Sequence, residues 1–232
     1  MSEAQQQDIV NWFNKTYKNR GQLYLRPKTA YYVFLEMLKA KKGQSYLDIA
    51  CGLGRLLEVG QEYGLNTSGI DISDVAIEKC KAQFPELDLR VTNAEALPFE
   101  DGSFDLVTCI GSLERMLNHK KVLQEMKRVG KEDCQYCILV RNADTKSWKY
   151  YKTLLGFKNK KGHQDAKSLT QWQQLFKSSG FKILKVYPDQ YDIKKTQNFL
   201  SFGLKKIDYK KIEQQENGLS NTGKFIFILK KK

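Results

Sequence analysis

The sequence predicts an α/β fold: a doubly wound, mostly parallel seven-stranded sheet with helices on both faces, a helical cap before it and a lid-like insertion. Three observations predict it. From residue 45, short apolar runs alternate with segments of helical periodicity, the pattern of a parallel sheet with covered faces. A glycine-rich turn links the first of these runs to a helical segment. A last apolar run, residues 224–229, follows the alternation as a final strand.

The expected strands are residues 45–50, 67–71, 87–92, 104–110, 136–141, 181–187 and 224–229. The expected helices are 53–63, one starting after Ser73, 119–129 and 168–176, with a further one near 199–212. Residues 1–40 read as a helical cap with a loop at 19–27, because their aromatic and aliphatic residues recur at helical spacing on both sides of that loop. Residues 143–166 do not fit the alternation, and an aromatic segment there would act as a lid that excludes water.

The stretch 45–73 organises the chain. Gly52 and Gly54 lack a Cβ, so the turn can adopt positive φ and a ligand can approach its backbone. The helix that follows directs its unpaired N–H groups into the same gap. Asp71 lies where a carboxylate can bind the ribose hydroxyls of a nucleoside. The stretch predicts a nucleoside cofactor; the alternative is a turn that only packs a helix tightly on a strand.

Two details favour S-adenosylmethionine over a dinucleotide. Asp48 precedes the glycines, where it would repel a pyrophosphate but suits the ammonium group of a methionine moiety. Leu57 stands where a third glycine or alanine of the dinucleotide fingerprint would let helix and strand touch.

With residues 93–107, which follow the third expected strand, the sequence resembles the class I S-adenosylmethionine-dependent methyltransferases. The resemblance is to their small-molecule branch, related to the ubiquinone and menaquinone methyltransferases. The family's D-x-G-x-G-x-G turn falls on residues 48–54, with Ala50 in place of the first glycine. Its acidic ribose ligand falls on Asp71, and its D-A-E-x-L-P-F segment on residues 93–99, with Asn93 in place of the first Asp. The resemblance runs from about residue 45 to 142 and, more loosely, to the C-terminus.

This resemblance implies a Rossmann-like single domain with an antiparallel last strand, in which residues 45–142 bind the cofactor and residues 167–232 complete the sheet. It also implies a methyl transfer to an O, N or C nucleophile of a small molecule, with S-adenosylhomocysteine as product. The residues expected to bind the cofactor are Arg26, Asp48, Ala50, Gly52, Gly54, Asp71, Ile72, Asn93, Ala94, Glu95, Ile110 and Gly111.

The acceptor site is expected beyond the strand ends, between the cap, the loop after residue 110 and the lid. Its candidate residues are Tyr17, Arg20, Ser112, Arg115, Arg141, Trp148 and Tyr151. For the cap residues the alternative is that the tyrosines only pack and the arginines are solvated.

Two catalytic candidates remain, His163 and Tyr24. His163 can act as a general base; the alternative is a surface histidine. Arg115 stands where the family often has a histidine, which argues against a histidine base at that position. His119 is expected to be a helix cap or surface residue. No metal site is expected.

The composition sets limits on the class of protein. The chain has 232 residues, 41% hydrophobic and 28% charged, as in a globular domain with a full core. No apolar run approaches the roughly 20 residues that cross a bilayer, and the N-terminus lacks a signal pattern, so a cytoplasmic protein is expected. The five cysteines are expected to be reduced and buried. Cys134 and Cys137 should point to opposite faces of a strand rather than form a redox or zinc pair.

The net charge of +13 leaves a rival open, a methyltransferase acting on RNA or DNA, against the alternative of a lysine-rich solvated surface. The fourth strand ends in Cys-Ile-Gly-Ser and not in the D/N-P-P-aromatic segment of enzymes that methylate nucleic-acid amino groups, and Cys109 reads as a core thiol rather than a nucleophile. The expected substrate is therefore a small molecule, with acidic ones among the candidates. A second rival is a catalytically inert partner protein. The sequence does not specify the substrate, the methylated atom or the oligomeric state.

Overall fold

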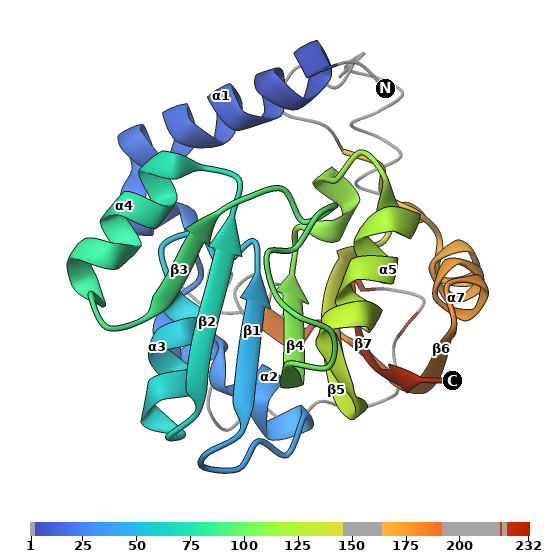
Figure 1. Ribbon diagram of the computed structural model, residues 1–232. Coiled ribbons are helices and arrows are strands. Elements are labelled where there is room, and N and C mark those ends of the chain that lie inside the picture. The colour runs from blue at the N-terminus through green and yellow to red at the C-terminus, as the bar shows by residue number, and fades with distance from the viewer. Residues whose placement is uncertain (1–2, 146–163, 192–218, 220–221) are drawn as a thin grey trace, which may run out of the picture.

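The computed structural model describes residues 3–145, 164–191, 219 and 222–232 (Figure 1). Seven strands form one sheet in the order β3-β2-β1-β4-β5-β7-β6. They are β1 (Ser45–Ile49), β2 (Asn66–Asp71), β3 (Asp88–Val91), β4 (Phe104–Ile110), β5 (Gly130–Arg141), β6 (Phe181–Pro188) and β7 (Lys224–Lys231). Only β7 runs antiparallel to its neighbours β5 and β6; the pairs among β1 to β5 are all parallel. The predicted doubly wound, mostly parallel sheet with an antiparallel last strand is confirmed.

The strand order reverses beside β1, which pairs with β2 on one side and β4 on the other. In such open sheets a crevice forms beyond the carboxyl ends of the strands at this switch point. The sequence therefore brings the ends of β1, β2 and β4 to one place, and the segments that follow these strands border it.

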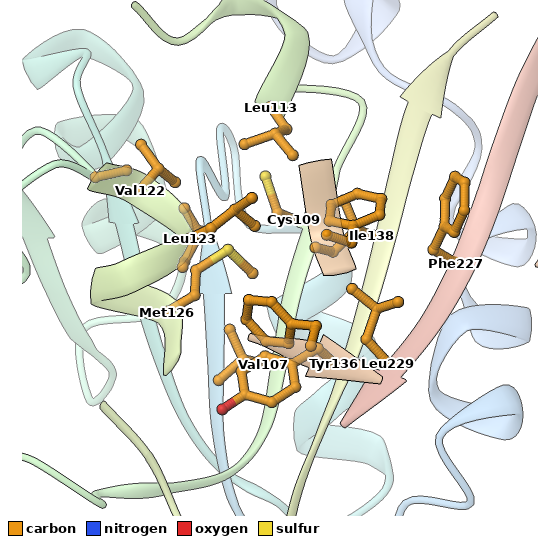
Figure 2. Close-up of a cluster of buried hydrophobic side chains, with 14 of the residues drawn as sticks. Val107, Cys109, Leu113, Val122, Leu123, Met126, Tyr136, Ile138, Phe227 and Leu229 are labelled. Carbon is orange, nitrogen blue, oxygen red and sulfur yellow. The ribbon is translucent and has the colours of Figure 1, made fainter. Parts of the chain in front are cut away.

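Helices cover both faces of the sheet. One face packs against α2 (Tyr32–Met37), α3 (Arg55–Glu62) and α4 (Asp74–Gln83), and the other against α5 (His119–Val129) and α7 (Leu169–Ser178). Figure 2 shows the second face, where Leu123 and Met126 of α5 meet Val107, Ile138 and Phe227 of the strands.

Successive side chains of β5 point to opposite faces of the sheet, and this alternation separates its two cysteines. Cys134 belongs to the core under α5, whereas Cys137 belongs to the core on the opposite face. Both are buried free thiols, as are the other three cysteines, so the prediction for the cysteines is confirmed.

The N-terminal segment forms the expected helical cap. Helix α1 (Glu3–Arg20) is followed by the short 3-10 helices η1 (Gly21–Tyr24) and η2 (Lys28–Ala30). In Figure 1, α1 lies across the end of the sheet toward which β1 and β2 point. The cap therefore covers the crevice that the strand order creates.

Two element starts and the place of His119 differ from the prediction in ways that have a clear cause. Strand β5 begins at Gly130, directly after α5, because Gly130 already pairs with Phe104; the charged run that follows it hid the strand start. Helix α3 begins at Arg55, with Gly54 as its cap. His119 was expected to be a cap or surface residue, and this prediction is wrong: Asn118 is the cap, and His119 is buried with its ring 5.6 Å from that of Trp172. The cause is the contact with α7, which no local pattern reveals.

The expected helix near 199–212 and most of the lid-like insertion lie outside the described residues, as do Trp148, Tyr151 and His163. Among the described residues, no helix is long and apolar enough to span a membrane. The same residues contain no group of three or more His, Cys, Asp or Glu placed to hold a metal ion.

Candidate functional site

The turn after β1 takes a left-handed backbone at alternate residues. The φ angles of Ala50, Gly52 and Gly54 are +59°, +56° and +77°. The two glycines have different roles. A Cβ on Gly54 would stand 2.4 Å from the sulfur of Cys80, so Gly54 lets α3 and α4 approach each other, whereas Gly52 faces the hydroxyl of Tyr17 in the crevice. Ala50 holds a conformation that costs a non-glycine residue about 1–2 kcal/mol.

Asp71, at the end of β2, fixes this turn. Its carboxylate accepts hydrogen bonds from the backbone N–H of Gly52 and of Ser73, both at 2.9 Å. Only 3% of the residue is exposed, and burial raises the pKa of the carboxyl group to about 6, although the backbone donors lower it. Each carboxylate oxygen keeps a lone pair for a ligand hydroxyl.

Asp48, in β1, is the second buried carboxylate. It accepts a hydrogen bond from the hydroxyl of Thr108 at 2.6 Å, and the hydroxyl of Tyr46 lies 2.7 Å from that same Thr108 oxygen. Burial, with a smaller contribution from the charge of Asp71, raises its pKa to about 7, although the hydrogen bond from Thr108 lowers it. Two carboxylates with elevated pKa values therefore flank the turn, as expected of a functional site.

Two cavities meet at this turn. One, the Asp71 pocket, is lined by Asp71, Ile72, Asn93 and Ala94 under α1. The other, the Asp48 pocket, has a volume of about 370 Å³, within the range of small-molecule sites. The lining shared by the two comprises Phe13, Tyr17, Ala50, Ser112 and Arg115.

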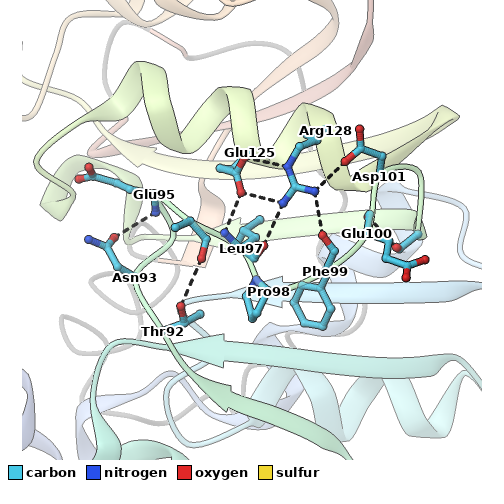
Figure 3. Close-up of polar contacts among 12 residues, drawn as sticks. Thr92, Asn93, Glu95, Leu97, Pro98, Phe99, Glu100, Asp101, Glu125 and Arg128 are labelled. Atoms are coloured by element: carbon cyan, nitrogen blue, oxygen red, sulfur yellow. Dashed lines mark hydrogen bonds and ion pairs between the residues drawn. The ribbon is translucent and has the colours of Figure 1, made fainter.

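The loop 92–101, beside the Asp71 pocket, is held by α5 (Figure 3). Arg128 donates to the backbone carbonyls of Leu97 at 2.9 Å and Phe99 at 2.8 Å, and it pairs with Asp101 and Glu125. Glu125 in turn accepts from the N–H of Leu97 at 2.7 Å. Sequence reasoning missed this network, because an Arg and a Glu three residues apart on a helix look like a solvated pair.

Asn93 opens this loop with both ends of its amide engaged. Its oxygen accepts from the N–H of Glu95 at 3.0 Å, and its nitrogen donates to Gln6 of α1 at 3.3 Å. The Glu95 carboxylate accepts from the N–H of Asn118 at 3.1 Å. Asn93 thus joins the loop to the cap, and Glu95 joins it to the start of α5.

A model of the methyltransferase domain family matches residues 47–138. This segment contains both carboxylates, the glycine turn and the loop 92–101. It therefore resembles the core of a class I methyltransferase.

Curated relatives agree over this core. The chain is 37% identical over 97 residues to demethylmenaquinone methyltransferase of Renibacterium salmoninarum, covering 42% of this chain and 41% of that protein. It is 36% identical over 108 residues to norajmaline N-methyltransferase of Rauvolfia serpentina, covering 43% and 37%. The matched segment thus spans about two fifths of these relatives' length.

A solved structure extends the similarity of fold to nearly the whole chain. A SAM-dependent methyltransferase of Thermotoga maritima superposes with a TM-score of 0.65 and 15% identity, covering 96% of this chain and 99% of that one. The cap and the last strands therefore follow a known methyltransferase architecture, while the sequence outside the core has diverged.

The carboxylates and apolar walls around the glycine turn fit S-adenosylmethionine. Asp71 offers lone pairs at the position of a ribose, the Asp71 pocket has the apolar walls that a base needs, and Asp48 offers a carboxylate to the cationic end. The Tyr17 hydroxyl stands only 2.8 Å from where a Cβ on Gly52 would be, so this ring packs directly onto the turn.

The second wall of the Asp48 pocket comes from distant segments of the chain. Arg26 pairs with Asp189, with one contact at 3.0 Å between residues 163 apart in sequence, and its guanidinium lies 4.5 Å from the ring centre of Tyr191. Arg26, which is expected to bind a ligand, therefore binds a carboxylate of the chain itself while still lining the pocket. Tyr24, Ile110, Gly111 and Arg141 line the same pocket.

Three expected site residues are placed differently. Gly54 packs against Cys80, Glu95 caps the start of α5, and Arg20 is exposed at the end of α1. None of the three lines either pocket.

Sequence reasoning also missed Glu114, Asp189 and Lys224. Glu114 is 2% exposed and lines the Asp48 pocket together with Lys224. For Glu114 a signal existed, since it directly precedes Arg115 in the loop after β4. For Asp189 and Lys224 no local pattern exists, because only the folded sheet brings them to the crevice.

Proposed function

We propose that the chain is a cytoplasmic S-adenosylmethionine-dependent methyltransferase that transfers a methyl group to an O, N or C nucleophile of a small molecule. The observation that carries the proposal is the placement of Asp48 and Asp71. Each is buried at the crevice end of its strand, and each lines one of two cavities that meet at the glycine turn.

The chain's own residues divide the work of binding. Asp71 holds the ribose hydroxyls, while Ile72, Asn93 and Ala94 form the base site. Asp48, with the turn at Ala50 and Gly52, holds the methionine end. S-adenosylmethionine supplies an activated methyl group with a good leaving group. What the protein adds is alignment of the acceptor and exclusion of water, which α1 and the loop after β4 provide by enclosing the crevice.

Of the two catalytic candidates, Tyr24 and His163, Tyr24 lies in the described pocket wall. Tyr24 lines the Asp48 pocket, and its ring lies 5.9 Å from that of Tyr17. His163 keeps its proposed role as an alternative base. Many acceptors of this chemistry need no strong base, because alignment supplies most of the rate.

Calorimetry with S-adenosylhomocysteine tests the donor half of the proposal. Wild type should bind, and Asp71→Ala should weaken binding by about 100-fold or more, since two charged hydrogen bonds are worth about 1.5–3 kcal/mol each. Asp74→Ala, an exposed carboxylate three residues away, is the matched control and should change little. Absence of binding by folded wild type would favour the inert partner protein.

Transfer of a labelled methyl group tests the acceptor half. The enzyme is incubated with labelled S-adenosylmethionine and either a small-molecule extract or total RNA and single-stranded DNA. Label in the small-molecule fraction supports the proposal. Label in nucleic acid, with salt-sensitive retention of tRNA in a shift assay, would support the nucleic-acid rival that the charge of +13 suggests.

A further inference from the structure

Two neighbouring side chains of the 3-10 helix η3 (Leu113–Arg115) present hydrogen-bonding atoms to the crevice that the described residues leave unpaired. The Glu114 side chain has a buried oxygen, Oε2, with no hydrogen-bond partner, and the Arg115 guanidinium has a buried nitrogen, Nη1, in the same state. Both residues line the Asp48 pocket. A buried polar atom without a partner costs about 1–3 kcal/mol, so such a pair points to a ligand that satisfies both.

The surroundings hold Arg115 in place. Its guanidinium lies 5.0 Å from the ring centre of Trp12 and 5.6 Å from that of Phe13, both on α1, and its backbone N–H donates to Ser112. An arginine stacked on rings keeps a fixed, planar set of donors, which suits a carboxylate. The group is therefore a prearranged anion receptor rather than a solvated charge.

The charged groups around Glu114 act on the pKa of its carboxyl group. Arg115, Arg141 and Lys224 line the pocket with it and lower its pKa, while burial, the larger effect, raises it. Arg115, with its unpaired Nη1, can bind an anionic group of a ligand, and Glu114, with its unpaired Oε2, can accept a hydrogen bond from a hydroxyl group on that ligand.

The remaining lining is aromatic. Phe13, Tyr17, Tyr24 and Tyr31 contribute rings to the Asp48 pocket. Four flat rings beside these charged groups favour an aromatic ligand.

Resting on the proposed function, we infer that the acceptor is a compact aromatic acid that also carries a hydroxyl group. Arg115 binds the acid group, and Glu114 binds the hydroxyl. The two residues thereby determine specificity, and the tests below measure binding, not turnover.

The experiment measures dissociation constants by calorimetry with S-adenosylhomocysteine present at saturation. The probes are 4-hydroxybenzoate, its uncharged analogue 4-hydroxybenzamide, and benzoate, which lacks the hydroxyl. Wild type should bind 4-hydroxybenzoate about tenfold or more tightly than either analogue, as one lost charged hydrogen bond implies. Arg115→Gln should remove the preference for acid over amide, and Glu114→Gln should reduce the preference for the hydroxyl to about twofold or less.

Two further variants serve as controls for effects that do not arise from the proposed contacts. Arg115→Lys keeps the charge and should retain part of the acid preference. Lys182→Gln removes one positive charge from an exposed position on β6 and should change neither preference. Circular dichroism and S-adenosylhomocysteine binding establish that each variant is folded.

The outcomes separate the two proposals. Failure of wild type to bind S-adenosylhomocysteine would refute the proposed function and, with it, this inference. Normal S-adenosylhomocysteine binding with equal affinity for acid and amide would refute the inference alone. So would an acid preference that survives in Arg115→Gln, or a hydroxyl preference that survives in Glu114→Gln.

Discussion

The two ends of the crevice are built in different ways. At the Asp71 pocket, backbone groups of one short stretch make the site: the N–H groups of Gly52 and Ser73 fix Asp71, and the loop 92–101 follows directly on β3. At the Asp48 pocket, side chains from distant segments make the wall, as in the Arg26–Asp189 pair. The difference teaches that the carboxylate of the Asp71 pocket is fixed by groups close in sequence, whereas the wall of the Asp48 pocket is formed only by the complete fold.

The largest effect should follow from disrupting the ion pair in the wall of the Asp48 pocket. Asp189→Ala removes the buried counter-charge of Arg26, and loss of one partner of a buried pair costs about 3–5 kcal/mol. Urea unfolding should show this loss, while affinity for S-adenosylhomocysteine should change by less than about threefold, or roughly 0.6 kcal/mol. The double variant Arg26→Met with Asp189→Leu should recover part of the stability. A large loss of donor affinity in folded Asp189→Ala would show that the two ends are not independent.

The loop 92–101, beside the Asp71 pocket, depends on remote side chains of α5. Arg128→Ala removes bonds to two loop carbonyls and should destabilise the protein by about 2 kcal/mol, a value kept low because the side chain is partly exposed. Hydrogen exchange at the amide of Leu97 should accelerate, and Lys121→Ala, on the exposed face of the same helix, is the control. An unchanged exchange rate at Leu97 would mean that the loop keeps its conformation without Arg128.

The pH dependence of stability compares the two carboxylates. Their folded pKa values, about 7 for Asp48 and about 6 for Asp71, exceed the unfolded value of about 3.9. The folded state therefore binds protons more tightly, and the stability of the unliganded protein falls as pH rises from about 4 through 7. Asp105 and Glu125 have lowered pKa values, so their opposite contribution is complete below this window.

Asp48→Asn should remove on the order of 2 kcal/mol of the loss between pH 5 and 8, measured by urea unfolding at each pH. Binding of a cationic ligand favours the ionised carboxylates, so S-adenosylmethionine affinity should rise over the same range in wild type. Parallel stability profiles for wild type and Asp48→Asn would contradict the burial argument.

The smallest effect concerns the turn itself. Ala50→Gly relieves a left-handed alanine and should stabilise the protein by about 0.5–1 kcal/mol, the strain less the extra entropy of an unfolded glycine. Gly52→Ala is the matched opposite: it adds strain and brings a methyl group to 2.8 Å from the Tyr17 hydroxyl, so it should destabilise. The two thermal unfolding midpoints should move in opposite directions. Equal shifts would show that the conformation of the turn is not under strain.

The comparison also explains what the sequence could predict. Period and turn chemistry locate β1 to β4, and spacing alone places Asp48 and Asp71 at the crevice, because these features act over a few residues. The N-terminal cap follows from helical spacing in the same way. Asp189 and Lys224 carry no such signal, since both reach the region of the Asp48 pocket only because β7 lies between β5 and β6. The prediction for His119 fails for the same reason: its burial depends on a contact with Trp172, 53 positions along the chain, and not on its sequence neighbours.

The Arg26–Asp189 pair also has a consequence for biosynthesis. The two residues are 163 positions apart, and a ribosome adding about 5–20 residues per second needs roughly 10–30 s to travel from one to the other. Throughout that interval the nascent arginine lacks the counter-ion it will have in the finished protein. A growing chain can therefore assemble the Asp71 carboxylate and its glycine turn well before the wall of the Asp48 pocket, which is complete only after Asp189 and Lys224 have been added.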